Sequence, residues 1–92
     1  MDELYTNIFN ALEADPAVAQ NLYVRSQLMI RLKDRISEQG LTQTEAAERI
    51  GVSGSTINEL LKGKIERFTV DALVNMLMRI GIGVEVVFKE AA

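Results

Sequence analysis

The stretch QTEAAERIGVSGSTINELLKGK, residues 43–64, decides the fold because it holds two short helical patterns joined by a tight turn. Thr42 and Glu45 form the sequence pattern of a capping box, which marks the start of the first helix. Gly51 can adopt the positive φ that a tight turn requires. Ser53 then caps the second helix, whose apolar side consists of Ile57, Leu60 and Leu61.

The residues around the turn fit the packing of two crossed helices. Ala47 precedes Gly51 by one helical turn, and its small side chain lets the second helix cross closely. Val52 and Ile57 are apolar and can fill the angle between the helices. This combination predicts a helix-turn-helix.

The flanking segments complete an all-α fold of about five helices. Apolar residues at helical spacing predict a short helix at 4–12 and a long helix at 17–39, which ends at Gln39-Gly40. The apolar stripe of the long helix is expected to consist of Val24, Leu28, Leu32 and Ile36. A last helix begins after Thr69 and runs to Ile80.

The end of the chain follows a different period. Val84, Val86 and Phe88 alternate with other residues, which predicts one C-terminal β-strand. The sequence offers no second strand, so we expect two copies to pair their strands across a homodimer. The alternative is an extended tail that packs on its own domain. The expected organisation is an acidic arm or short helix (1–16), a helix-turn-helix domain (17–82) and a dimerisation strand with tail (83–92).

Composition excludes several classes of site. The 92 residues include no cysteine and no histidine, and the net charge is -3. We therefore expect no disulfide, no metal site, no cofactor and no small-molecule substrate. Glu45 and Glu48 could suggest paired carboxylates, but such a pair is more often a solvated face, so no catalytic residue is expected. The absence of a signal-like or membrane-spanning pattern leads us to expect a cytoplasmic protein.

The negative charge is unevenly distributed. Four acidic residues and no basic residue lie in residues 1–20, whereas residues 21–92 carry ten basic and nine acidic side chains. A locally basic face on the main domain is therefore compatible with the acidic total. The first segment combines its acidity with apolar residues, and we expect either packing on the domain or binding of a partner through Leu4, Tyr5, Ile8 and Phe9.

The motif LTQTEAAERIGVSGSTINELLKGK resembles the helix-turn-helix of the XRE family, the Cro and phage-repressor type. Residues 22–90 further resemble HigA-type antitoxins, because the turn motif is followed by FTVDAL and IGIGVEVVF. This resemblance implies a dimer that binds operator DNA, represses its own operon and neutralises a basic, RelE-like toxin that cleaves messenger RNA.

The resemblance also implies a set of DNA-binding positions. These are Gln43, Ser53, Gly54, Ser55, Thr56, Asn58, Lys62 and Lys64. Gly54 departs from the family, in which many members carry a long side chain there. Physical chemistry supports the set, because a reading helix enters the major groove by its N-terminus and Asn can bond adenine through two hydrogen bonds. The alternative for the hydroxyl residues is capping of a surface helix. At the level of function, the alternatives are a stand-alone XRE-type regulator and a protein-interaction module that does not bind DNA.

Overall fold

The computed structural model describes residues 14–90. Over this range the chain forms four α-helices and one 3-10 turn, and it contains no strand. The elements are α2 (Pro16–Glu38), α3 (Gln43–Ile50), α4 (Gly54–Leu61), η1 (Ile65–Arg67) and α5 (Val70–Arg79). The predicted helix at 4–12 and the predicted partner-binding residues Leu4, Tyr5, Ile8 and Phe9 lie outside the described residues.

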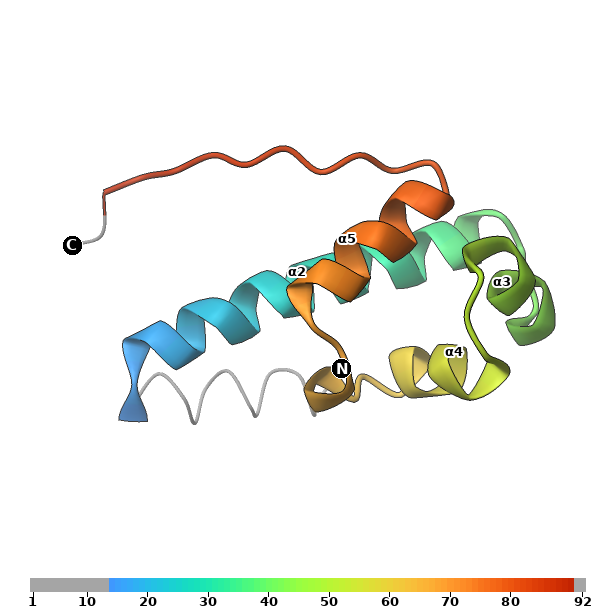
Figure 1. The fold of residues 1–92 in the computed structure, drawn as a ribbon, viewed down its shortest axis with the longest axis horizontal. Coiled ribbons are helices and arrows are strands. Elements are labelled where there is room, and N and C mark those ends of the chain that lie inside the picture. Colours follow the sequence, from blue (N-terminus) through green and yellow to red (C-terminus); the bar gives the residue numbers. More distant parts are fainter. Residues whose placement is uncertain (1–13, 91–92) are drawn as a thin grey trace.

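The long helix α2 organises the domain (Figure 1). Helix α5 runs alongside it and makes its most extensive helix contact, while α3 and α4 gather near the C-terminal half of α2. Helix α2 begins where Asp15 accepts a hydrogen bond from the backbone N–H of Ala17 at 3.0 Å, with Pro16 in the first turn. Its predicted end at Gln39-Gly40 is confirmed, since Gln39 is the C-cap and Gly40 has a φ of 62°.

The buried face of α2 differs from the predicted stripe. Leu32 and Ile36 are buried as expected, but Val24 and Leu28 are only half-buried, and Met29 is fully buried instead. A strict four-residue repeat rotates about 40° around the helix at every step, so the four positions spread over about 120° and are not equally buried, although Leu28 still packs against the core. The actual face alternates between three- and four-residue steps, as in Met29, Leu32 and Ile36.

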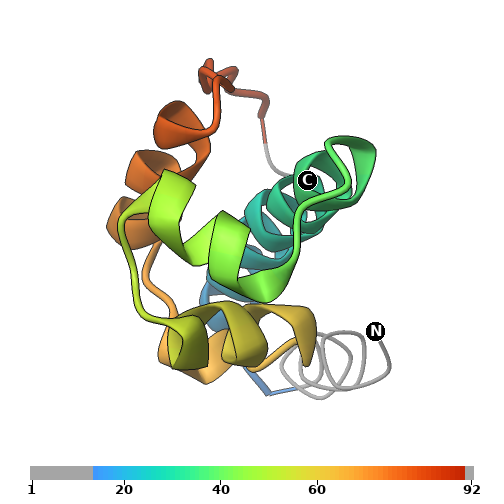
Figure 2. The same ribbon diagram turned by 90° about the vertical axis from the view of Figure 1, so that its right-hand side faces the viewer.

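The predicted helix-turn-helix is present (Figure 2). Helices α3 and α4 cross and pack on each other, and Gly51 between them adopts the left-handed conformation with a φ of 81°. Ile57 and Leu60 of α4 are buried at 0% exposure, whereas Leu61, which was expected to be buried with them, is 36% exposed. The core also takes in Ile65 and Phe68 from the region of η1, an element that the sequence did not predict.

The predicted C-terminal strand is absent from the described residues. Residues 82–90 form an extended segment that reverses direction after α5 and extends away from α3 and α4 (Figure 1). A strand needs a neighbour that accepts its backbone hydrogen bonds, and the single described chain supplies none for this segment. The exposed fractions of Val84, Val86 and Phe88 are 41%, 72% and 90%, so the alternative of a tail packed on its own core does not hold either.

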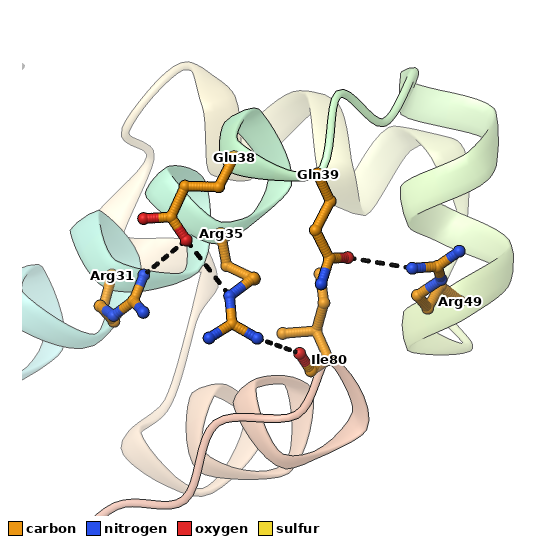
Figure 3. Close-up of polar contacts among 6 residues, drawn as sticks. All are labelled: Arg31, Arg35, Glu38, Gln39, Arg49 and Ile80. Atoms are coloured by element: carbon orange, nitrogen blue, oxygen red, sulfur yellow. Dashed lines mark hydrogen bonds and ion pairs between the residues drawn. The ribbon is translucent and has the colours of Figure 1, made fainter.

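Polar contacts fix the C-terminal end of α2 to its neighbours (Figure 3). Arg35 donates from Nη1 to the carbonyl oxygen of Ile80 at 3.0 Å, which fastens α2 to the end of α5. Arg49 on α3 donates to Oε1 of Gln39, also at 3.0 Å. Arg31 and Arg35 both contact Oε1 of Glu38, at 3.4 and 3.3 Å. These contacts hold α3 and α5 in place relative to α2.

Candidate nucleic-acid interface

The N-terminal half of α4 is polar and largely exposed. Its cap is Ser53, whose Oγ accepts a hydrogen bond from the backbone N–H of Thr56 at 3.1 Å and lies 2.9 Å from the Thr56 hydroxyl. The prediction that Ser53 caps this helix is confirmed, and the half-buried Thr56 hydroxyl is already engaged with it. Ser55 is exposed and takes no part in the cap. The cap orders the first turn of α4 and leaves Ser55 available to a ligand.

Gly54 leaves open space at the first position of α4. A Cβ built at this position would have no heavy atom within 4 Å, and the backbone has no positive φ. Packing and conformation therefore do not require glycine here. The backbone N–H groups of Gly54 and Ser55 make no hydrogen bond within the part of the chain that the structure describes. A helix N-terminus of this kind can accept an anionic group such as a phosphate.

Helix α3 presents a second exposed N-terminus. Thr42 is its N-cap, and the predicted capping box is confirmed: the Thr42 N–H donates to Oε1 of Glu45 at 2.9 Å, while the Glu45 N–H donates to the Thr42 hydroxyl at 3.1 Å. Gln43 is the first residue of the helix and is exposed. The position is suitable for contact with a ligand that spans α3 and α4.

Hydrogen bonding and charge both act on the capping box. The backbone N–H of Thr42, followed by its hydroxyl and by the charge of Arg49, lowers the pKa of Glu45 below its ordinary value. The carboxylate therefore remains ionised at the N-terminus of α3 at neutral pH, which stabilises this end of the helix.

Two lysines follow α4. Lys62 is the C-cap of the helix and is exposed, and Lys64 precedes η1 and is half-buried. Gly63 between them has a φ of 74° and is buried, so the loop turns tightly while the lysines flank it. The loop therefore places two positive charges directly after α4.

The outward face of α4 includes a residue that the sequence analysis did not assign. Successive residues of an α-helix are separated by about 100°, so Ser55, Glu59 and Lys62 lie within about 60° of one another, opposite the buried Ile57 and Leu60. Asn58, which is half-buried, lies at the flank of this face. Helical spacing from Ser55 was the signal that could have identified Glu59.

An arginine outside the helix-turn-helix contacts this face. Nε of Arg67 in η1 is 3.1 Å from Oε2 of Glu59. Arg67 and Thr56 also line a shallow hollow between the turn, η1 and α5, together with Val52 and Arg79. Nη1 of Arg79 would be only 3.0 Å from a Cβ at Gly51, so α5 covers the back of the turn. The turn is thus held from behind while the outer face of α4 stays exposed.

Comparison with known protein families identifies the class of domain. The described residues contain no helix with the length and apolar character needed to cross a membrane. No curated protein is significantly similar to the chain. A family model for a helix-turn-helix domain matches residues 12–89, which is most of the chain and includes α2, both helices of the motif, α5 and the extended segment. The chain therefore belongs to the helix-turn-helix domain family, with the XRE-like arrangement that its motif resembles.

Proposed function

We propose that the chain is a sequence-specific DNA-binding repressor, which inserts the N-terminal half of α4 into the major groove of its operator. Membership in the helix-turn-helix family supports the class of partner. The proposal assigns no enzymatic activity to the chain.

One observation carries the proposal: the first turn of α4 is ordered and polar, yet unobstructed. Ser55 is exposed, Gly54 leaves open space, and their backbone N–H groups lack partners among the described residues. Lys62 lies on the same face one helical turn after Asn58. This combination suits a DNA surface, because base edges require polar side chains and the flanking phosphates require positive charge and N–H donors.

The proposal includes a homodimer that is held by the C-terminal segment. Its apolar side chains are exposed, and the α5 residues Val74 and Met78 are 36% and 62% exposed. A Cβ at Gly83 would lie 3.7 Å from Cε of Met78, so the segment starts against this side of α5. Antiparallel pairing of two segments would satisfy their backbones and cover this apolar surface. A two-fold dimer would also present two copies of α4 to DNA, ideally about 34 Å apart.

The finer proposal is an antitoxin that neutralises a basic, RNA-cleaving toxin. It is supported by the resemblance to HigA-type antitoxins and by the acidic, partly apolar sequence of residues 1–14. We expect that deleting residues 1–14 weakens binding to the product of an adjacent toxin gene but preserves DNA binding, because Asp15, the cap of α2, is retained. Isothermal titration with that toxin measures the effect. An unchanged affinity for the toxin would show that residues 1–14 do not contact it.

The experiment that tests the DNA proposal is direct. Fluorescence anisotropy compares binding of the full chain to a duplex from upstream of its own gene with binding to a shuffled duplex. We expect tighter binding to the upstream duplex and a loss of affinity with added salt. If the two duplexes bind equally and without salt dependence, or do not bind at all, the result would favour a protein-interaction module. The exposed apolar segment after α5 also fits that function.

A further inference from the structure

An acidic side chain on the outward face of α4, the proposed DNA-reading face, requires an explanation. Glu59 shares the outward face of α4 with Ser55 and Lys62, opposite the buried Ile57 and Leu60. Its side chain is 29% exposed and is held at one end by Arg67. The phosphates of DNA repel a nearby carboxylate. A carboxylate on this face therefore needs a positive charge beside it and a hydrogen-bond donor on the DNA.

Arg67 provides the compensation. Its Nε lies 3.1 Å from Oε2 of Glu59, and its own side chain is 63% exposed. Arg67 belongs to η1, which the buried residues Ile65 and Phe68 fasten to the core, so the guanidinium reaches α4 from a fixed element. An ionised carboxylate has about four acceptor positions, and a single Nε contact leaves the others for a second donor.

We propose that Glu59 selects a cytosine in the operator by accepting a hydrogen bond from its N4 amino group, and that Arg67 is the positioning residue for this contact. In the major groove, guanine presents two acceptors, and thymine presents an acceptor and a methyl group, so neither donates to a carboxylate. Adenine presents an amino donor beside its N7 acceptor, and that acceptor repels a carboxylate. Cytosine presents an amino donor there, and Glu is its matching side chain. The inference rests on the proposed function, in which α4 enters the major groove.

The competing interpretation is a surface ion pair with no role in recognition, which is common among exposed charged residues. The two interpretations differ in base preference. A structural pair affects all DNA sequences equally, whereas a reading residue acts at one base position. The matched variants are Glu59→Gln and Glu59→Ala, and the charge control is Glu66→Ala, an exposed glutamate next to Arg67 in η1.

The experiment is selection from a library of randomised DNA duplexes, carried out with the full-length wild type and each variant, with circular dichroism to verify folding. We expect the wild type to prefer cytosine at one position of each half-site by at least about fivefold, the lower end of a good base contact. Glu59→Ala should abolish that preference alone, and Glu66→Ala should retain it. Glu59→Gln should move the preference towards adenine, the base that glutamine bonds best. Misfolding cannot produce this switch.

Arg67→Ala separates positioning from phosphate binding. We expect it to weaken the cytosine preference while the salt dependence of binding stays constant. A salt slope that falls by about one, with the preference intact, would show that Arg67 binds a phosphate and would overturn its positioning role. An identical selected motif for wild type, Glu59→Ala and Glu59→Gln would overturn the inference but leave the proposed function standing. If the wild type selects no motif, the proposed function itself fails.

Discussion

At the scale of single residues, Gly51 and Gly54 differ in whether the fold requires a glycine. Gly51 has a φ of 81° and the Arg79 guanidinium against it, so the turn between α3 and α4 requires it. Gly54 has no positive φ and no neighbour within 4 Å of its missing Cβ. The fold does not explain Gly54, whereas the proposed function accounts for it through a close approach of DNA to the start of α4.

The two glycines predict opposite effects of alanine. Gly51→Ala should lower the free energy of unfolding by about 1–2 kcal/mol, the cost of a left-handed conformation in a residue with a Cβ. Gly54→Ala should leave it unchanged or raise it by up to about 0.5 kcal/mol, since alanine favours a helix more than glycine does. Urea unfolding of the two variants measures both values. On operator DNA, Gly54→Ala should still bind more weakly than wild type; an unchanged affinity would show that DNA does not approach there.

At the scale of elements, the capping box of α3 links stability to pH. The pKa of Glu45 is lowered in the fold by its hydrogen bonds with Thr42 and by Arg49. A carboxyl group whose pKa is lowered on folding stabilises the protein above its unfolded pKa, about 4.3 for glutamate. This contribution is lost as the pH falls below that value and through the folded pKa.

Glu45→Gln isolates this contribution. Glutamine can still accept the hydrogen bond from Thr42 but cannot ionise. We expect the variant to be less stable than wild type at neutral pH and to approach it as the pH falls below about 4. Thermal unfolding between pH 3 and about 7 measures the difference. A gap that stays constant with pH would show that the charge of Glu45 has no role at the start of α3.

The extended segment after α5 is the second element with a testable role. Val86 is 72% exposed in the single chain. In an antiparallel pair, Val86→Pro would remove a backbone donor, so the variant should sediment as a monomer while wild type forms a dimer. The melting temperature of wild type should also rise with protein concentration, and that of the variant should not. A proline variant that remains dimeric would exclude the segment as the main interface.

Local signals predicted the helix-turn-helix and its caps well. Three helices are capped through a side-chain hydrogen bond as predicted, from Thr42, Ser53 and Thr69. These caps could be predicted because capping depends only on residues within one helical turn. The buried face of α2 and the exposure of Leu61 were missed, since they depend on which neighbouring element covers each side. Arg67 could not be assigned to α4 from spacing, because η1 brings it there through the packing of Ile65 and Phe68.

At the scale of the whole molecule, the net charge of -3 does not describe the proposed DNA-binding surface. The acidity is concentrated in residues 1–20, and the exposed Lys62 follows directly after α4. Arg31 and Arg35 both contact Glu38, and Arg35 also fastens α2 to α5, so these two charges are engaged within the domain. The proposed phosphate contacts therefore rest on the loop at Lys62 and Lys64 and on the helix N-termini.

The most direct test of the central claim is a salt titration of wild type, Asn58→Ala and Lys62→Ala on the upstream duplex and a shuffled one. Asn58→Ala removes a side chain that is proposed to read a base. The variant should therefore lose about 1–3 kcal/mol of binding free energy on the upstream duplex and little on the shuffled one. Lys62→Ala should weaken binding to both duplexes alike and reduce the salt slope by about one. If wild type shows no salt-dependent preference for the upstream duplex, the chain does not read DNA through α4.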